Sequence, residues 1–277
     1  MTDQKIIQEN GIVVKTVPMG TDCRKITLDS PEAFAEARPG QFVTLAIAGM
    51  DTPLLRRPFS IHSISGIKEG RCLVDILFKV VGIFTKNLSE IKNQGRVNIL
   101  GPLGHGFTWP KKSRTEKSGP VVIIGGGIGV APLLFLAQSL RQQRPVHENS
   151  RVFIGGRTTS DILCADDFTR LGYKVIISTD DGTRGEKGMI TTPFHARLSD
   201  SRPETIYACG PMPMLKAVFE TAAEHKVPCQ VSVETVMACG LGVCLGCAVK
   251  TSSDDIKFRH VCKDGPVFDA SELWMAS

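Results

Sequence analysis

Short runs rich in Val, Ile and Leu alternate with polar and turn-forming residues through residues 6–109. The runs are GIVVKTV, CRKITLD, QFVTLAIAG, RCLVDILFKVV and RVNILGP, and Gly, Pro or Asp punctuates them. Short strands of this kind, with only FTKNLSEI as a short helical pattern, are typical of a closed barrel. The pattern therefore predicts an all-β, barrel-forming domain at the N-terminal end.

The pattern changes after KKSRTEKSG at residues 111–119, a basic stretch that we interpret as a solvated linker. From there to about residue 228, apolar strands such as GPVVIIGGG and ETIYACGP alternate with helices whose apolar residues lie three and four positions apart. This alternation predicts a Rossmann-like α/β domain with a parallel sheet. We expect three domains: a β-barrel at 1–112, the α/β domain at 113–230 and a small C-terminal domain at 231–277.

The composition restricts the class of protein. Hydrophobic residues make up 42% and charged residues 22% of the 277 residues, as in globular proteins. The net charge of +5, from 33 basic and 28 acidic residues, is small and scattered, which argues against nucleic-acid binding. The uncharged run at 121–140 has the length of a membrane span, but its glycines and Pro132 would break such a helix. We therefore expect no membrane span.

The cysteine count bears on the compartment. The stretch MTDQKIIQEN shows no basic-then-apolar signal pattern. The chain has nine cysteines, an odd number, and this count together with the missing signal argues against a disulfide framework. We therefore expect a cytoplasmic protein whose clustered thiols bind metal.

A glycine-rich turn joins a predicted strand to a predicted helix in IIGGGIGVAP. Glycines let the backbone approach a pyrophosphate, and the helix N-terminus offers free N–H donors. The turn departs from G-x-G-x-x-G at Val130, so an ordinary tight turn is the alternative. A second strand ends in YACGPMPML, and ligands of parallel sheets bind at the carboxyl ends of strands. The candidate binding residues are Gly125, Gly126, Gly127, Gly129, Cys209, Gly210 and Pro211.

Four cysteines near the C-terminus have a metal-binding spacing. Cys239, Cys244 and Cys247 form C-x4-C-x2-C, the spacing of plant-type [2Fe–2S] sites, and Cys262 follows after fourteen residues. Thiolates are the ligands that iron–sulfur clusters require. One alternative is a zinc site, although zinc ribbons usually show two C-x2-C pairs. The other alternative is four unrelated buried thiols, which is how we interpret most of the remaining cysteines.

The motifs RRPFS, GGGIGVAPL and YACGPMPML, in this order, resemble the ferredoxin–NADP reductase superfamily. The resemblance covers residues 6–228 and implies a flavin-binding barrel followed by a nicotinamide-binding domain. It implies that an arginine of RRPFS pairs with the FAD pyrophosphate and that its serine lies near the reactive flavin nitrogen. Relatives often have glycine at the position of Phe84, so the resemblance does not define the local backbone path there. The implied FAD-binding residues are Arg57, Pro58, Phe59, Ser60, Leu77, Phe78, Lys79, Gly82 and Thr85.

With its fourteen-residue gap, MACGLGVCLGC followed by VCKDGPVFD resembles the electron-transfer subunit family of type B dihydroorotate dehydrogenase. The resemblance implies FAD, a [2Fe–2S] cluster and NAD(H). It also implies a heterotetramer with an FMN-containing catalytic subunit that oxidises dihydroorotate. FAD exchanges electrons singly or in pairs, so it belongs between nicotinamide and cluster.

We expect no catalytic acid or base, because the chain shows no Ser-His-Asp or paired-carboxylate signature, and we interpret Glu234 as structural. One alternative function is the same module serving a sulfite reductase, a hydrogenase or a bifurcating transhydrogenase. Another is a sensor that binds flavin and cluster without turnover. Asp180 and Asp181 stand where a reductase specific for NADP would need a cation, which favours NAD(H), although Arg157 and Arg184 are near in sequence.

Overall fold

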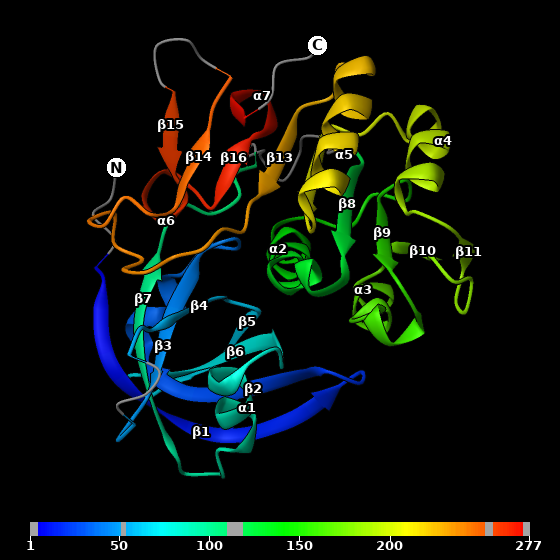
Figure 1. Ribbon diagram of the computed structural model, residues 1–277. Coiled ribbons are helices and arrows are strands. Elements are labelled where there is room, and N and C mark those ends of the chain that lie inside the picture. Colours follow the sequence, from blue (N-terminus) through cyan, green and yellow to red (C-terminus); the bar gives the residue numbers. More distant parts are fainter. Residues whose placement is uncertain (1–4, 51–53, 110–118, 253–256, 274–277) are drawn as a thin grey trace.

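The computed structural model describes residues 5–50, 54–109, 119–252 and 257–273. A strand-rich barrel lies below a parallel sheet with helices on both faces, and a smaller region of short strands and helices joins the two (Figure 1). The basic stretch at 111–119 and the expected boundary at 112/113 lie almost wholly outside the described residues.

The N-terminal part is a seven-stranded antiparallel sheet with the order β4-β3-β7-β1-β2-β6-β5. Alternate residues of β6 are buried, and this strand lies beside β2 over its whole length. The barrel prediction is confirmed, but the apolar pattern misses β5 because most of its side chains are exposed. The elements are β1 (Ile7–Met19), β2 (Cys23–Pro31), η1 (Glu32–Glu36), β3 (Phe42–Ile47), β4 (Arg57–Ser60), β5 (Ser63–Lys68), β6 (Arg71–Lys79), α1 (Ile83–Glu90) and β7 (Arg96–Leu103).

The second part is a sheet with the order β11-β10-β9-β8-β12-β13-β16, parallel except for β16. Chain order reverses between β8 and β12, which creates a switch point at their carboxyl ends. The elements are β8 (Val121–Gly126), η2 (Gly127–Gly129), α2 (Val130–Gln143), β9 (Arg151–Gly156), η3 (Thr159–Asp161), α3 (Ala165–Arg170), β10 (Lys174–Thr179), β11 (Glu186–Lys187), α4 (Thr191–Ser201), β12 (Thr205–Cys209), α5 (Met212–Glu224) and β13 (Cys229–Ser232).

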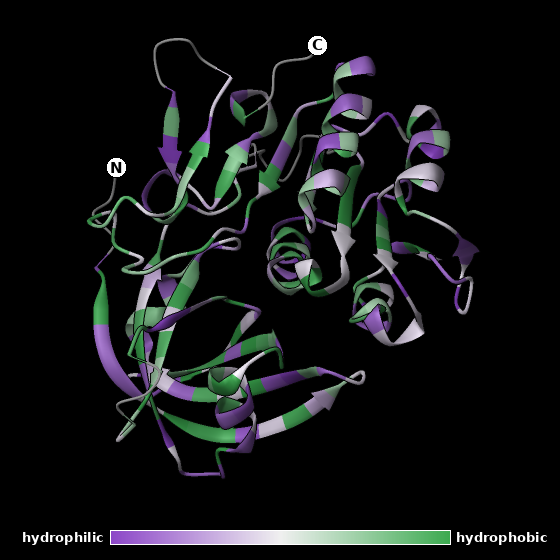
Figure 2. Cartoon of the chain, viewed as in Figure 1, coloured by the Kyte–Doolittle hydropathy of each residue, from purple (hydrophilic) through white to green (hydrophobic). Residues whose placement is uncertain are grey.

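Helices cover both faces of this sheet. Leu133 of α2 and Phe168 of α3 pack with Ile123 on one face, and Phe194 of α4 and Leu215 of α5 pack on the other. Figure 2 shows hydrophobic colour along β8 and β9 and mixed colour on α4 and α5. The doubly wound α/β prediction is confirmed.

The uncharged run at 121–140 divides into β8, η2 and α2. Within the described ranges, no helix is long and apolar enough to cross a membrane.

The C-terminal region contains β14 (Ala248–Lys250), β15 (Phe258–His260), α6 (Val261–Asp264), β16 (Val267–Asp269) and α7 (Ala270–Leu273). β14 and β15 form a hairpin, whereas β16 pairs with β13 and extends the parallel sheet. The expected boundary at 230/231 falls inside β13 and stays a prediction.

A short segment after β7 contacts all three parts. The His105 amide donates to the carbonyl of Gly265, and the Phe107 amide donates to the carbonyl of Pro39 at 2.7 Å. The Thr108 carbonyl accepts hydrogen bonds from the Tyr207 hydroxyl and the Gln230 amide. The barrel, the parallel sheet and the C-terminal region are therefore joined at residues 105–108.

Candidate nucleotide and iron–sulfur sites

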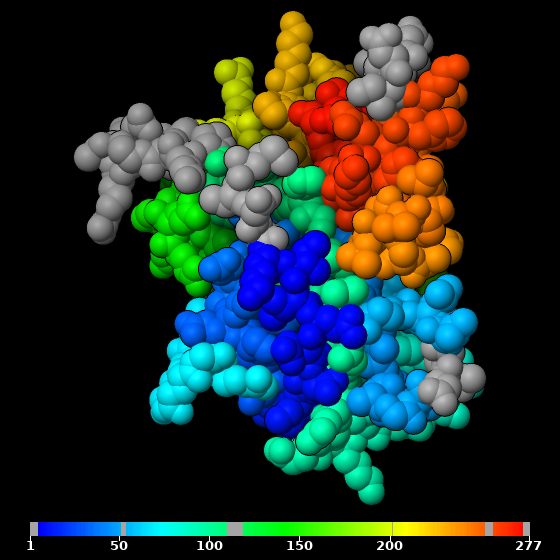
Figure 3. Space-filling view, turned by 90° about the vertical axis from the view of Figure 1, so that its left-hand side faces the viewer, coloured from blue at the N-terminus to red at the C-terminus, as the bar shows by residue number. Residues whose placement is uncertain are grey.

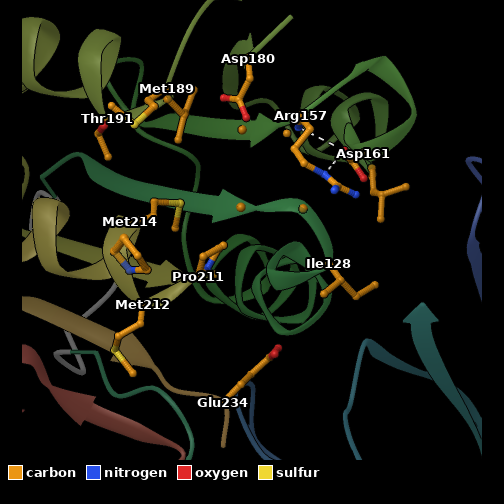
Figure 4. Close-up of a pocket in the computed structure, with 18 of the residues that line it drawn as sticks. Ile128, Arg157, Asp161, Asp180, Met189, Thr191, Pro211, Met212, Met214 and Glu234 are labelled. Carbon is orange, nitrogen blue, oxygen red and sulfur yellow. Dashed lines mark hydrogen bonds and ion pairs between the residues drawn. The ribbon is translucent and has the colours of Figure 1, made fainter. Parts of the chain in front are cut away.

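A pocket of about 830 Å³ opens at the carboxyl ends of the parallel strands, at the switch point. Gly126 and Gly127 line it from the end of β8, and Gly210 and Pro211 line it from the end of β12. Cys23 and Lys79 of the barrel complete the wall. The pocket therefore lies between the barrel and the α/β part, with side chains from several strand ends pointing into it (Figure 4).

The glycines of the turn have different structural roles. A Cβ on Gly126 would lie 2.8 Å from both Met214 Sδ and Pro211 Cδ, and a Cβ on Gly129 would collide with the Cys209 carbonyl. These two glycines allow β8 and β12 to end side by side. Gly127 has a φ of +53° with open space beside it, so its backbone faces the pocket. Gly125 packs under the helix, where a Cβ would lie 2.6 Å from Val130 Cγ1.

Cys209 lies behind the pocket and is not part of its wall. Its side chain is 1% exposed, and burial raises the pKa of its thiol. Pro211 and Gly210, by contrast, both reach the cavity, and Pro211 is the N-cap of α5. A direct role for the Cys209 thiol in binding stays a prediction.

Charged side chains line the far end of the pocket. Asp180, directly after β10, contributes to the wall. Asp181 turns away, because its carboxylate accepts the Thr183 amide and hydroxyl, and these bonds lower its pKa. Arg157 follows β9, and its Nε lies 3.7 Å from Asp161 Oδ2. Only Asp180 of the acidic pair therefore faces the pocket, and the nearby arginine already has a carboxylate partner (Figure 4).

Glu234 lies on the opposite side of the pocket from Asp180 (Figure 4). Its side chain is exposed to the open cavity, and desolvation by the protein around the cavity raises the pKa of its carboxyl group. The sequence analysis interpreted this residue as structural and missed its place in the pocket wall. Its position two residues after β13, at the carboxyl end of a parallel strand, is the signal that could have found it.

The two arginines of RRPFS differ in their contacts. The Arg56 guanidinium donates to Thr44 and Asn98, each through a side-chain oxygen and the carbonyl, at 2.7–3.0 Å. Arg57 donates from one nitrogen to the carbonyls of Leu55 and Arg56. Among the described residues, therefore, Arg57 retains N–H donors for a phosphate, as the resemblance implies.

The other candidate FAD residues gather around β4 and β6. The Phe59 ring lies 5.9 Å from that of Phe78 and 6.0 Å from that of Phe84, so Phe84 fits the barrel core and α1 forms without a glycine there. Leu77 and Phe78 are buried and offer a ligand only their backbone. Pro58 and Ser60 of β4 are half-buried.

The start of α1 is already organised by its own side chains. The Thr85 hydroxyl accepts the amides of Val81 and Gly82 and donates to the Gly82 carbonyl, which makes it a helix cap. Open space lies beside Gly82, and the flanking Val81 and Ile83 are exposed. An uncovered apolar surface beside a helix N-terminus, together with Arg57, fits a flavin nucleotide.

Two contacts link the four cysteines of the predicted cluster, one between Cys247 and Cys262 and one between Cys239 and the backbone of Cys244, although no three possible ligands surround one metal position among the described residues. The Sγ atoms of Cys247 and Cys262 lie 3.2 Å apart. The Sγ of Cys239 accepts hydrogen bonds from the backbone amides of Leu241 and Cys244 at 3.3 and 3.4 Å. These two bonds lower the pKa of Cys239 to about 6, and the bond from Cys244 has the larger effect. A binuclear cluster takes two thiolates on each iron, so the pairing fits the [2Fe–2S] prediction.

The loop that carries these cysteines packs on the barrel. A Cβ on Gly240 would lie 3.0 Å from Thr44 Cγ2 of β3, and Cys247 and Cys262 share a buried cluster with Phe42 and Leu103. Cys244, in contrast, is exposed. Figure 3 shows the orange cysteine segment at the surface, directly above barrel residues in lighter blue.

Family comparisons agree with this arrangement. Residues 123–220 match the oxidoreductase NAD-binding domain, and residues 234–274 match the iron–sulfur cluster binding domain of dihydroorotate dehydrogenase B. The NADH-dependent reduced ferredoxin-NADP oxidoreductase, a structure reported for flavin-based electron bifurcation, has a TM-score of 0.77 at 30% identity over 95% of this chain and 89% of that chain. The fold and sites thus define an iron–sulfur oxidoreductase of the ferredoxin–NADP reductase class.

Curated relatives narrow the class. The chain is 40% identical to the dihydroorotate dehydrogenase B (NAD(+)) electron transfer subunit of Desulforamulus reducens, over 88% of this chain and 90% of that protein. It is 32% identical to the subunit of the same name from Fusobacterium nucleatum, over 96% and 98%. The chain therefore belongs to the family of dihydroorotate dehydrogenase B electron transfer subunits, as the resemblance implied.

Replacement of Cys247 tests the cluster ligands. We expect Cys247→Ala to lose the visible absorption and the iron and sulfide of a [2Fe–2S] centre while flavin stays bound, because the thiolate pair is broken. Cys229→Ala, which removes a buried thiol outside the loop, should keep the cluster. Unchanged iron and sulfide in the Cys247 variant would show that the ligand assignment is wrong.

Replacement of Arg57 tests the flavin site. Arg57→Met should raise the dissociation constant for FAD about 10- to 100-fold, because one or two charge-assisted hydrogen bonds to phosphate are lost. Titration of the apoprotein measures this change. Arg56→Met is the matched control, and we expect it to lower thermal stability because it leaves Thr44 and Asn98 without their shared donor. Heat-released flavin should be FAD, and FMN alone would contradict the assignment.

The dinucleotide preference follows from Asp180. We expect kcat/KM with ferricyanide as acceptor to be higher for NADH than for NADPH, because a carboxylate repels the 2′-phosphate. Asp180 is exposed, so water and salt screen its charge. We therefore expect Asp180→Asn to lower the ratio of kcat/KM for NADH to that for NADPH only about 5-fold, or about 1 kcal/mol. A wild-type ratio below one would overturn the argument, and Arg157→Ala would then show whether that arginine is responsible.

Proposed function

We propose that this chain passes electrons between NAD(H) and an FMN-containing catalytic subunit that oxidises dihydroorotate in pyrimidine biosynthesis. In this proposal the chain holds NAD(H) in the pocket at the switch point, FAD on the barrel and a [2Fe–2S] cluster in the cysteine loop. When bound, FAD exchanges a hydride equivalent with nicotinamide and single electrons with the cluster. The protein contributes binding, orientation and exclusion of water.

The observation that carries the proposal is the meeting of three sites around one junction. The pocket includes Lys79 at the end of β6, and β6 lies against β4, which bears Arg57 and Ser60. The cysteine loop packs on β3, the neighbour of β4 in the barrel. The nucleotide pocket, the proposed flavin surface and the cysteine loop therefore adjoin neighbouring strands of one barrel, as electron transfer through a single chain requires.

The surface of the cysteine loop supports a protein partner. Leu241, Val243 and Leu245 surround the exposed Cys244 and are themselves 46%, 79% and 58% exposed. Large apolar side chains gathered at an electron exit are typical of a protein contact. By its family, we propose a heterotetramer of two copies of each subunit. Cysteines held as thiolate ligands also favour a reducing compartment, and on this ground we propose the cytoplasm.

A second candidate is the same module working with another redox partner. The likeness in fold to a bifurcating NADH-dependent reduced ferredoxin-NADP oxidoreductase is the observation that favours it. The relatives named above, at 40% and 32% identity over most of the chain, favour dihydroorotate oxidation instead. Identification of the proteins that copurify with the native chain distinguishes the two.

Turnover assays test the proposal. We expect the isolated chain to oxidise NADH with ferricyanide but not to oxidise dihydroorotate, because its sequence motifs account for nicotinamide, FAD and a cluster and none indicates a second organic substrate. The reconstituted complex with its partner should reduce NAD with dihydroorotate. Cys247→Ala should keep the ferricyanide reaction and lose the coupled one. Dihydroorotate oxidation by the chain alone would refute the assignment of this reaction to the partner subunit. Absence of any turnover would favour the alternative that the chain is a sensor.

A further inference from the structure

His62 is a fully buried polar residue between the barrel and α2. It lies between β4 and β5, and its side chain is 1% exposed. Its Nδ1 is 2.8 Å from the carbonyl oxygen of Ala131. A carbonyl oxygen can only accept, so Nδ1 carries the proton and donates it to Ala131. Burial lowers the pKa of His62, and the ring is therefore neutral.

This hydrogen bond joins the two ligand-binding motifs by a very short path. His62 is two residues after Ser60, the last residue of RRPFS, and Ala131 is two residues after Gly129, the last glycine of the turn. The intervening Ile61 and Val130 are both buried, at 0% and 1% exposure. The flavin strand and the first turn of the nucleotide helix are therefore fixed to each other at this point.

Most other contacts between α2 and the barrel are less directional. Leu77 of β6 shares a buried apolar cluster with Leu134, and Phe135 packs against the barrel core. Apolar packing resists separation but tolerates sliding. Lys79 also forms an ion pair with Asp161 of η3, outside α2, but the pair spans 3.8 Å and is partly exposed, so it is weak. Trp109 Nε1 donates to Gln143 Oε1 at the C-terminal end of α2, and the bond from His62 to Ala131 is the directional contact at the first turn.

The neighbouring charged groups do not compete for the imidazole. Asp75, one of the carboxylates that act on His62, accepts hydrogen bonds from Thr27 and Ser63 and lies 3.9 Å from Lys25 Nζ. Its acceptor capacity is thus used inside the barrel. An apolar side chain would fill the His62 site without the cost of burying an imidazole, so the hydrogen bond is what this residue adds.

We infer that His62 is a positioning residue, which holds the glycine turn, and with it a bound nicotinamide, at the correct distance from the flavin. The inference rests on the proposed function, because it requires hydride transfer between the two sites. Reacting atoms must approach to about 3–3.5 Å, and a misplacement of about 1 Å can cost roughly 100-fold in rate. A single directional bond at the junction of both motifs is suited to prevent such a shift.

The test compares three variants by stopped-flow reduction of the holoprotein with NADH. His62→Leu removes the donor, and we expect flavin reduction to slow about 10- to 100-fold. FAD content and NADH affinity should change little, whereas the long-wavelength absorption of stacked nicotinamide and flavin should disappear and the isotope effect with deuterated NADH should rise. His62→Asn places an amide donor where Nδ1 lies and should restore most of the rate and the absorption band.

Ser63→Ala is the matched control, because it removes a neighbouring, partly buried hydrogen bond whose acceptor, Asp75, lies in the barrel. It should behave as wild type. Equal slowing of Ser63→Ala and His62→Leu would reduce His62 to a structural role, and a wild-type rate and band in His62→Leu would overturn the inference. If His62→Leu does not fold, His62→Met gives the same comparison. Failure of the wild-type protein to be reduced by NADH would instead contradict the proposed function. The wild type therefore tests the proposed function, and the His62→Leu variant tests the role of His62.

Discussion

The burial of α2 between the barrel and the parallel sheet is the contact on which the other features depend. Val130, Leu133, Leu136 and Leu140 are all nearly inaccessible, because one side of the helix meets the sheet and another meets the barrel. A helix that is apolar on most sides must be covered on most sides. This explains why a stretch with the length and hydropathy of a membrane span belongs to the centre of this protein. It also places the first turn of α2 between the proposed flavin and nicotinamide sites.

The sequence predicts those parts of the sites whose residues are neighbours in the chain. The glycine turn and the C-x4-C-x2-C spacing are local, because a backbone path and a ligand loop each need specific residues at fixed offsets. Thr85 shows the limit of this approach: its position was foreseen, but its hydroxyl caps α1, and a cap cannot be distinguished from a ligand contact without the local geometry. Cys209 likewise lies at the foreseen strand end, with its side chain turned into the core.

The residues that sequence reasoning missed depend on long-range packing. Glu234 reaches the pocket because β13 ends beside β12, and His62 meets α2 only after the barrel and the α/β part have come together. Each lies two residues beyond a predicted motif or a strand, but the sequence does not show which distant segment it meets. The different contacts of Arg56 and Arg57 are a similar case, since the partners Thr44 and Asn98 lie on two other strands. Such features arise from the assembled barrel and have no local signature.

The position of β16 has a consequence for how the chain reaches its folded state. This strand covers the edge of β13, yet the whole cysteine loop separates the two in sequence. An uncovered edge strand presents unpaired backbone groups that can recruit strands from other molecules. Until the cysteine loop has folded and β16 has paired, the edge strand β13 stays exposed and prone to aggregation. Contacts between residues so distant in sequence form slowly. Closure of the cysteine loop and protection of this sheet edge are thus linked through a strand of three residues.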